Sequence, residues 1–466
     1  MKIHISGVCG TATASLAGLL KARGHEVTGS DQDVYPPMSD ELARMGVPVS
    51  SPYAEANIPK DADLVVIGNA LSRGNPEVEA VLDAKRRYTS QAALLADEFL
   101  RDRVSIVVAG THGKTTTTSM LTHVLKHAGF DPSFLIGGVS LDLGQSYGLG
   151  SGPHFVVEGD EYDTAFFDKR PKFVHYLPDL AIIGNLEFDH ADIYADLPAV
   201  QLAFTRLMSV IPRRGLLIAG IESPALAAIL DRAKSRVATF ALGEVEGASW
   251  QARDVVLSSA GAAFDVFHEG ERLGRIAMSA SGNHNVRNAL AAAVAALEAG
   301  VPFDRIAAAF AAFRGVKRRL EVRGEVRGVS VYDDFAHHPT AVRETIAALR
   351  SRIGEGERVV TIFEPRSYTS RTKVFELDFA RAFATADEVV ISADHLPGKV
   401  PEAQRISEET LVASINREGG RARFIRTVDE IVADLSGRLR RGDHVLVLSN
   451  GGFGGIHEKL LNALRS

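Results

Sequence analysis

The sequence VAGTHGKTT, at residues 108–116, decides the fold of this chain. The apolar run before it, residues 105–109, predicts a buried parallel strand, and the residues from Lys114 onward predict a helix. A glycine turn between a strand and a helix directs several backbone N–H groups and the positive end of the helix dipole at one point. Lys114 adds a positive charge for the β- and γ-phosphates of a nucleotide, and Thr115 adds a hydroxyl for Mg²⁺. We therefore predict an ATP site whose phosphate loop is this turn.

The loop departs from the usual phosphate-loop pattern, which places a glycine where this chain has Val108. The shorter pattern G-T-x-G-K-T-T specifies more positions, so it indicates a smaller set of enzymes. The alternative is a Gly/Thr-rich turn with an exposed lysine, but it does not explain why strand, glycines, lysine and threonine follow in this order.

Composition limits the class of protein. A chain of 466 residues is expected to hold about three domains. Its net charge is −6 and it has no basic block, which argues against a nucleic-acid partner. The mean hydropathy of +0.02 is ordinary for a globular protein, and no apolar run approaches the roughly 20 residues of a membrane span. The single cysteine, Cys9, excludes internal disulfides and, with the absence of a signal peptide, predicts a cytoplasmic protein.

The pattern of strands and helices predicts three α/β units, at residues 1–103, 104–316 and 317–466. In the first unit a strand, a glycine turn, a helix and a second strand ending at Asp31 follow the order of a nucleotide-binding unit. The second unit begins with the phosphate loop and includes an alternating stretch, residues 250–278, that predicts a small antiparallel patch.

The third unit again alternates strands with helices, which predicts another doubly wound sheet. Its predicted strands are residues 329–332, 358–363, 388–392 and 444–448.

Polar residues follow two predicted strands of the second unit. Residues 158–163 hold four acids, of which Glu158 stands at the strand tip and is expected to share Mg²⁺ with the nucleotide. The alternative for this run is a solvated acidic loop. The next strand leads to Asp189 and His190, and His190 either binds a second metal or orients water.

Three further segments carry candidate residues. Residues 281–289 are rich in asparagine, whose amides either contact adenosine or cap an ordinary helix. Residues 331–340 contain two aspartates and two histidines, for which metal binding competes with helix capping. Arg366 and Arg371 either grip a carboxylate or phosphate, or belong to a solvated basic loop. We interpret Cys9 as a small apolar residue in a turn rather than a nucleophile.

These motifs, in this order, resemble those of the ATP-dependent Mur ligases of peptidoglycan metabolism over essentially the whole chain. The motifs are GTHGKTT at 110–116, EGDE at 158–161, Asn185 with Asp189-His190, GNHN at 282–285 and DDFAHHP at 333–339. In the first unit, GVCGT at 7–11, DVYPPMS at 33–39 and GNALSRGNP at 68–76 resemble the branch of the family that recycles a murein tripeptide. The branch that adds L-alanine typically has G-I-G-G-x-G-M-S in the first turn, a pattern absent here.

The resemblance implies a three-domain enzyme with a Rossmann-like UDP-binding domain, a central P-loop ATPase domain and a Rossmann-like C-terminal domain. It implies an ATP- and Mg²⁺-dependent ligase that joins UDP-N-acetylmuramate to L-alanyl-γ-D-glutamyl-meso-diaminopimelate through an acyl phosphate. Closure of the third domain onto the central one would complete the site.

The resemblance also distributes roles among the residues. The implied catalytic residues are Lys114, Glu158 and His190. The implied metal ligands are Thr115, Glu158 and His190. The implied ATP-binding residues are Gly110, Thr111, His112, Gly113, Lys114, Thr115, Thr116, Asn283, His284, Asn285, Asn288, Arg319 and Asp334. The implied UDP-sugar residues are Gly7, Cys9, Gly10, Thr11, Asp31, Asn69 and Ser72. Because the third domain should hold the incoming peptide, Arg366, Tyr368 and Arg371 are candidates for peptide binding.

One departure concerns the second metal. Several Mur ligases carry a carbamylated lysine after the Asp-His motif, whereas the first lysine after His190 in this chain is Lys234, within a later helix pattern. We expect Glu187 or water to fill the gap.

Four alternatives remain at this point. The first is a ligase of the same chemistry that takes L-alanine. A folylpolyglutamate synthase has no counterpart of the first unit. An NAD-dependent oxidoreductase leaves the ATP loop unexplained, because the first turn is G-x-x-G rather than G-x-G-x-x-G. A non-enzymatic ATP switch would bind nucleotide without forming an amide.

Overall fold

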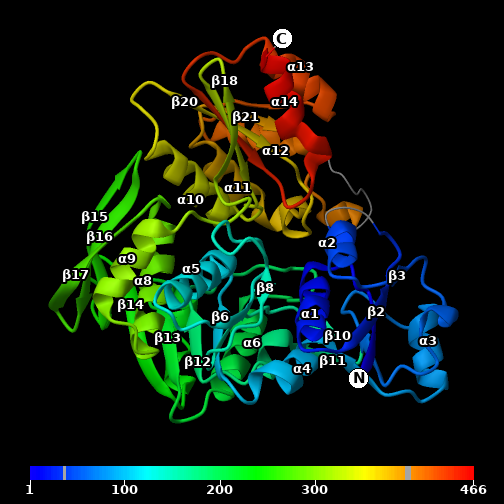
Figure 1. Cartoon of the computed structure of the whole chain (residues 1–466). Helices are drawn as coiled ribbons and strands as arrows, with labels where there is room; N and C mark the ends of the chain where they lie inside the picture. Colours follow the sequence, from blue (N-terminus) through cyan, green and yellow to red (C-terminus); the bar gives the residue numbers. More distant parts are fainter. Residues whose placement is uncertain (35–37, 394–399, 466) are drawn as a thin grey trace.

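The computed structural model describes residues 1–34, 38–393 and 400–465. Tyr35, Pro36 and Pro37 of the DVYPPMS motif lie outside the described residues. The described strands form three main sheets of 5, 10 and 6 strands, with a separate two-stranded ribbon. Figure 1 shows them as three bodies: the first in blue, the second in cyan to green and the third in yellow to red. The predicted α/β class, with three units built on mainly parallel sheets, is confirmed.

The first sheet is entirely parallel, in the order β3-β2-β1-β4-β5. Its strands are β1 (Lys2–Ser6), β2 (Glu26–Ser30), β3 (Val49–Ser50), β4 (Leu64–Ile67) and β5 (Tyr88–Ser90). Its helices are α1 (Thr11–Ala22), α2 (Met38–Arg44), α3 (Pro76–Asp83) and α4 (Gln91–Leu95). One continuous core joins this sheet to the central domain, because Leu16 and Leu20 of α1 belong to the same buried cluster as Phe155 and Phe204.

The central sheet has the order β17-β16-β15-β14-β13-β12-β6-β9-β7-β8. Its strands are β6 (Val104–Ala109), β7 (Ser133–Leu135), β8 (Tyr147–Gly148), β9 (His154–Glu158), β12 (Leu180–Ile183), β13 (Leu216–Gly220), β14 (Arg236–Leu242), β15 (Trp250–Ser258), β16 (Gly261–His268) and β17 (Glu271–Met278). The ribbon is β10 (Asp163–Ala165) with β11 (Asp168–Pro171). The predicted antiparallel patch is present, but it continues the parallel sheet because β14 pairs with β15 in parallel.

The helices of the central domain cover both faces of this sheet. They are α5 (Lys114–His127), α6 (Leu197–Ser209), α7 (Pro224–Ala227), α8 (Asn283–Glu298) and α9 (Phe303–Ala312). Helix α8 is rich in buried alanines, whose small side chains let it pack closely between the sheet and α5.

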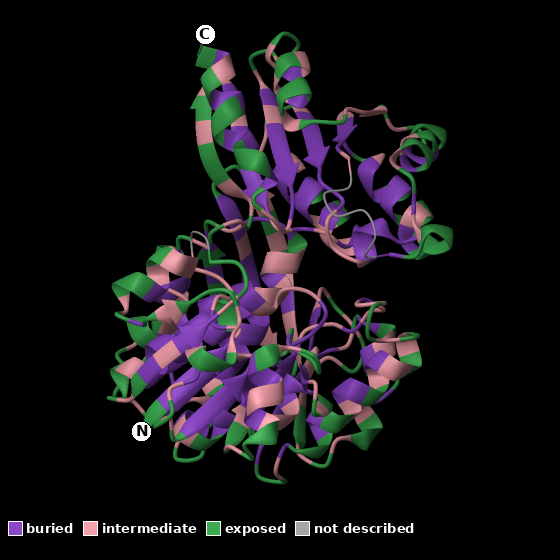
Figure 2. Ribbon diagram, turned by 90° about the vertical axis from the view of Figure 1, so that its right-hand side faces the viewer, coloured by how far each residue is buried: buried purple, intermediate pink, exposed green. Residues whose placement is uncertain are grey.

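The third sheet has the order β18-β19-β23-β20-β21-β22, parallel except for the β18–β19 hairpin. Its strands are β18 (Glu321–Val326), β19 (Val329–Asp334), β20 (Arg358–Phe363), β21 (Glu388–Ile391), β22 (Ala422–Phe424) and β23 (Asp443–Leu448). Its helices are α10 (Pro339–Arg350), α11 (Glu376–Phe383), α12 (Glu408–Arg417), α13 (Val428–Ser436) and α14 (Ile456–Arg465). Figure 2 shows these strands buried between helices whose outer faces are exposed.

Each main sheet is made from one part of the chain: residues 2–90, 104–278 and 321–448. We therefore propose domain boundaries at 103/104 and 316/317, where no sheet crosses. In the part of the chain that the structure describes, no helix has the length and apolarity needed to cross a membrane.

A buried carboxylate ties the first domain together. Glu77, in the first turn of α3, is fully buried and accepts hydrogen bonds of 2.5 Å from the hydroxyls of both Ser6 and Ser30. It also accepts a hydrogen bond of 2.9 Å from the Asn57 amide. These bonds join the carboxyl ends of β1 and β2 to α3.

We expect Glu77→Ala to weaken this end of the first sheet by about 3 kcal/mol, because a buried hydroxyl left unpaired costs about 1–3 kcal/mol. Hydrogen exchange measured by mass spectrometry should show faster exchange in β1 and β2. The matched control is Glu79→Ala in the same helix turn. It removes a partly exposed pair with Arg73 and a hydrogen bond from the Gly74 N–H, and should leave exchange in β1 and β2 unchanged. Equal exchange in the two variants would contradict the role of Glu77.

Candidate active site

The turn between β6 and α5 requires its glycines. Gly110 and Gly113 have φ of +135° and +83°, and a Cβ on Gly113 would lie 2.4 Å from Asn288 Oδ1. Asn185, just after β12, fixes the turn: its backbone oxygen accepts from the N–H of Thr111 at 3.1 Å, and its Oδ1 accepts from the N–H of His112 at 2.8 Å. No side chain caps α5, so the N–H groups of its first turn are available to an anion.

Lys114 belongs to a row of charged side chains that are joined by hydrogen bonds. Its Nζ donates to the backbone oxygens of Gly110 and Thr111, at 2.8 and 3.2 Å, and to Glu161 Oε1 at 2.8 Å. Burial opposes the charge on Lys114, but the carboxylates of Glu161, Asp160 and Glu158 together outweigh this effect and raise the lysine's pKa. The same Glu161 oxygen lies 3.1 Å from Nε2 of His190. Lys114 is therefore held charged beside the loop.

Glu161 was not assigned a role from the sequence, although it lies within the acidic run. It is 2% exposed, and its other oxygen, Oε2, has no hydrogen-bond partner among the described residues. An unpartnered buried carboxylate oxygen next to His190 fits a cation at this position.

The predicted metal pair, Thr115 and Glu158, is brought together by α5 and β9. Thr115 Oγ1 donates to Glu158 Oε1 at 3.1 Å, and the N–H of Gly137 donates to Oε2 at 2.7 Å. Burial raises the pKa of Glu158 above its ordinary value. A hydroxyl and a carboxylate side by side provide the oxygen ligands that Mg²⁺ prefers, so these residues fit the ion.

The third domain reaches this pair directly. Arg319 Nη2 donates to Thr115 Oγ1 at 3.3 Å. Asp334, at the end of β19, is buried and accepts from the N–H of Leu320 at 2.7 Å, which fixes the backbone next to Arg319. Burial raises the pKa of Asp334. The structure thus places Asp334 where it positions the loop that carries Arg319.

The start of α8 lies beside the phosphate loop. The Asn285 amide donates to the backbone oxygen of Ser281 at 2.8 Å, and the Asn288 amide donates to Asn285 Oδ1 at 3.3 Å. His284 has a pKa lowered by burial, and its Nδ1 is buried without a partner among the described residues. Asn283 is exposed and lies outside the cavity lining.

All three domains line one cavity of about 1000 Å³. The central domain contributes the phosphate loop, Glu158, His190 and the start of α8, and the third domain contributes Arg319 and Asp334. This volume lies at the upper end of the range for small-molecule sites.

Among the predicted UDP-sugar residues, Thr11 lines this cavity, and its first-domain neighbours there include Ser15 and Met38. Gly7, Cys9, Gly10, Asp31, Asn69 and Ser72 lie outside its lining. The carboxylate of Asp31 accepts from the N–H of Cys9 at 2.8 Å and from the Tyr53 hydroxyl at 2.9 Å.

The three candidates for peptide binding differ in exposure. Arg371 is 3% exposed, and its Nε donates to the backbone oxygen of Ser367 at 3.1 Å. Arg366 is partly exposed and lies against Gly451, where a Cβ would lie 2.4 Å from Nη1. Tyr368 is also partly exposed, and its hydroxyl donates to Gln404 at 3.3 Å.

Sequence reasoning missed the contacts between the central and third domains. Thr369 donates to the buried carboxylate of Asp189 at 2.6 Å, across 180 residues of sequence. Glu187 contacts His112, Thr340 and His338, whereas His190 is partnered by Glu161. Neither contact has a local pattern that could have revealed it.

Two smaller expectations can be compared with the structure. Burial raises the pKa of the Cys9 thiol to about 11, which disfavours the thiolate and agrees with a residue that is not a nucleophile. The expectation that Lys234 lies in a helix was wrong: it is an exposed residue between Arg232 and β14.

Comparison with known proteins covers nearly the whole chain. Residues 2–103 match the description "Mur ligase family, catalytic domain", residues 108–296 match "Mur ligase middle domain", and residues 318–451 match "Mur ligase, glutamate ligase domain".

Individual relatives match over their full length. The chain is 44% identical over 469 residues to the UDP-N-acetylmuramate–L-alanyl-γ-D-glutamyl-meso-2,6-diaminoheptandioate ligase of Escherichia coli (strain K12), which covers 100% of this chain and 98% of that protein. It is 34% identical over 466 residues to the UDP-N-acetylmuramate–L-alanine ligase of Geobacter sp. (strain M21), with 100% and 98% covered. The crystal structure of a murein peptide ligase from Psychrobacter arcticus 273-4 is similar at a TM-score of 0.76 and 38% identity, with 100% and 99% covered.

The raised pKa of Glu158 predicts how Mg²⁺ binding depends on pH. A carboxyl with a raised pKa keeps its proton above the ordinary value of 4.5, and a bound cation must displace that proton. We therefore expect Mg²⁺ affinity, measured by calorimetric titration, to increase as the pH rises above that ordinary value and Glu158 loses its proton. Glu158→Gln should abolish this dependence, whereas Asp163→Asn, in the same acidic run, should preserve it. A pH dependence unchanged in Glu158→Gln would contradict the assignment.

Proposed function

The chain belongs to the Mur ligase family, and from this premise we propose that it joins UDP-N-acetylmuramate to L-alanyl-γ-D-glutamyl-meso-diaminopimelate with hydrolysis of ATP, in peptidoglycan recycling. The observation that carries the proposal is the 44% identity, along the whole chain, to a ligase named for this tripeptide. The L-alanine ligase named above is more distant, at 34%. The Lys114–Glu161–His190 chain and the Thr115–Glu158 pair support the same chemistry.

In the first step the lactyl carboxylate of UDP-N-acetylmuramate attacks the γ-phosphorus of ATP, which gives an acyl phosphate and ADP. Two anions must approach each other, so the protein has to supply positive charge. Lys114, the N–H groups of the loop and Arg319 are the groups placed to do so. Mg²⁺ held by Thr115 and Glu158 would neutralise phosphate charge, and His190 with Glu161 would hold a second ion.

In the second step the amine of the tripeptide's L-alanine attacks the acyl carbonyl carbon, and the C–O bond to phosphate breaks. The amine loses one proton as the amide forms, and this proton leaves with the departing phosphate as hydrogen phosphate. Arg319 comes from the third domain, so the site is complete only while that domain lies against the central one, as here.

We assign the residues accordingly. The phosphate loop, the start of α8, Arg319 and Asp334 surround ATP. The first domain, through Thr11 and the turn before it, holds the UDP-sugar, and the surface around Arg366 and Tyr368 takes the peptide. The alternative of an NAD-dependent oxidoreductase does not explain why Lys114 is held, largely buried, against the phosphate loop.

The choice of amine is the most direct test of the proposal. We expect phosphate release, with UDP-N-acetylmuramate and ATP present, to be much faster with the tripeptide than with L-alanine at equal concentration. Amide formation is checked by mass spectrometry, because a non-enzymatic ATP switch would release no coupled product. Comparable or faster turnover with L-alanine would replace this proposal with the L-alanine ligase.

The second test concerns Lys114. We expect Lys114→Ala to lower kcat by at least about 10²–10³-fold, the typical cost of removing one preorganised charge stabiliser from a transition state. The control is Lys169→Ala, which removes an exposed lysine paired with Asp163 and should keep activity. Circular dichroism of both variants verifies the fold. Near-normal turnover in Lys114→Ala would remove the residue from the mechanism.

A further inference from the structure

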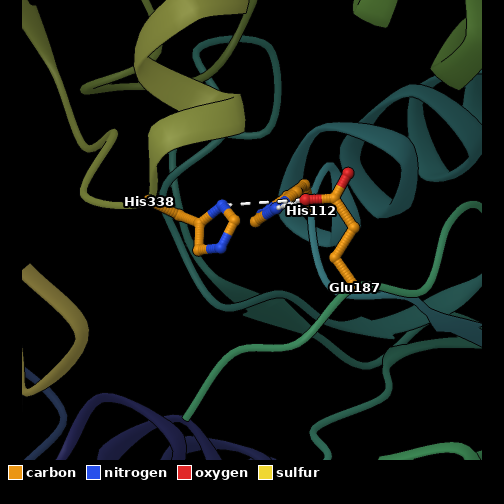
Figure 3. Close-up of side chains that lie close together, drawn as sticks. All are labelled: His112, Glu187 and His338. Atoms are coloured by element: carbon orange, nitrogen blue, oxygen red, sulfur yellow. Dashed lines mark hydrogen bonds and ion pairs between the residues drawn. The ribbon is translucent and has the colours of Figure 1, made fainter. Parts of the chain in front are cut away.

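Three side chains from two domains converge in the lining of the cavity, at a point where the proposed mechanism assigns no metal ion. His112 comes from the phosphate loop, Glu187 from the segment after β12, and His338 from the start of α10 (Figure 3). One ligand atom of each lies within 4.8 Å of the others. Figure 3 shows both imidazoles directed toward the Glu187 carboxylate.

The hydrogen bonds of His338 fix which nitrogen carries its proton. Nε2 lies 3.2 Å from the backbone oxygen of Phe188, which only accepts, so Nε2 is protonated. Nδ1 accepts from the N–H of Thr340 at 3.3 Å, so it is the unprotonated nitrogen, and it lies 3.8 Å from Glu187 Oε2. A histidine whose far N–H donates to a backbone carbonyl is the usual arrangement of a metal ligand.

The charge state of the cluster also suits a cation. Burial lowers the pKa of His338 to about 3, so its imidazole is neutral. Burial opposes ionisation of Glu187, but hydrogen bonds from His112 and Thr340 outweigh it and hold the pKa of Glu187 at about 2. A neutral imidazole and an ionised carboxylate are the forms in which these two side chains bind a cation.

The distances are close to those of a tetrahedral centre. Zinc ligands lie about 2.0–2.1 Å from the metal, which separates them from each other by roughly 3.3 Å. His112 Nε2 lies 3.3 Å from Glu187 Oε2, and His338 Nδ1 lies 3.8 Å from the same oxygen. All three ligand atoms lie within 4.8 Å of one another, so binding requires the side chains to move closer together. It also requires loss of the His112 Nε2 proton and exchange of the long hydrogen bond from the Thr340 N–H for the metal.

We propose that His112, Glu187 and His338 form a site for a transition-metal cation of the Zn²⁺ class, which joins the central and third domains. Imidazole ligands favour such cations over Mg²⁺, which prefers oxygen. His112 and Glu187 belong to the central domain and His338 to the third, so a bound ion holds the two domains together. The hydrogen bond from Thr340 to Glu187, at 2.7 Å, already joins the two domains at this point.

Co²⁺, a spectroscopic substitute for Zn²⁺, tests the site without reference to enzyme activity. We expect the full-length protein, in excess Mg²⁺, to bind one Co²⁺ with visible absorption of low-coordinate nitrogen and oxygen ligation. His338→Ala and Glu187→Gln should each lower the affinity by more than the roughly 10–100-fold typical of losing an outer-shell partner. His338→Ala also removes the residue that caps α10, so this variant can fail to fold. In that case Glu187→Gln alone provides the test.

Two control variants separate this site from others. His268→Gln removes an exposed histidine that stacks on Trp250, and His190→Gln removes the imidazole near Glu161. Both should bind Co²⁺ as the unmodified protein does. Loss of the signal in His190→Gln with retention in Glu187→Gln would overturn the proposal, as would absence of Co²⁺ binding in excess Mg²⁺.

Hydrogen exchange tests the bridging role. Co²⁺ should slow exchange of the amides at residues 336–342, at the start of α10, in the unmodified protein but not in Glu187→Gln. Metal binding without this protection would refute the link between the domains.

Discussion

The ion pair between Lys114 and Glu161 is the interaction on which the site depends. Both charges are largely buried, at 15% and 2% side-chain exposure, so removing them from water is costly unless each is well partnered. Lys114 meets this condition with three acceptors, two of which are backbone oxygens of its own loop. The lysine therefore stabilises the turn that presents it, and Glu161 connects the turn to His190.

This arrangement follows from the order of strands in the central sheet. β6 lies between β9 and β12, all three run parallel, and their carboxyl ends therefore meet at one edge. The phosphate loop follows β6, Glu158 ends β9, and Asn185 follows β12. The first and third domains then cover this edge: α1 shares a core with the central domain, and the loop of Arg319 reaches Thr115.

The sequence predicted what depends on local pattern. Apolar runs between turn residues predicted strands such as residues 358–363, and the glycine-lysine-threonine order predicted the loop that the structure shows. The short strands β7 and β8 were not predicted, because two or three residues in a strand have no distinctive period. The contacts of Glu161, Asp189 and Glu187 were also missed. Each joins segments far apart in the sequence, and their partners are set by the packing of elements and domains rather than by neighbours in the chain.

The residues that select the amine substrate are also set by domain packing rather than by a local sequence pattern. The phosphate loop and the acids beside it can activate a carboxylate by phosphorylation. In the proposed mechanism they contact ATP, however, and make no contact that could select the amine of the second step. On the third domain, Arg371 is 3% exposed and its Nε donates to the backbone oxygen of Ser367. Arg366 and Tyr368 keep partly exposed surface, and Gly451 leaves room for the Arg366 side chain, since a Cβ there would collide with it. A guanidinium held in this way can pair with a carboxylate, and the tripeptide carries more carboxylates than L-alanine does. Selectivity for the larger amine is therefore expected to arise from this surface, at a distance from the loop that determines the fold.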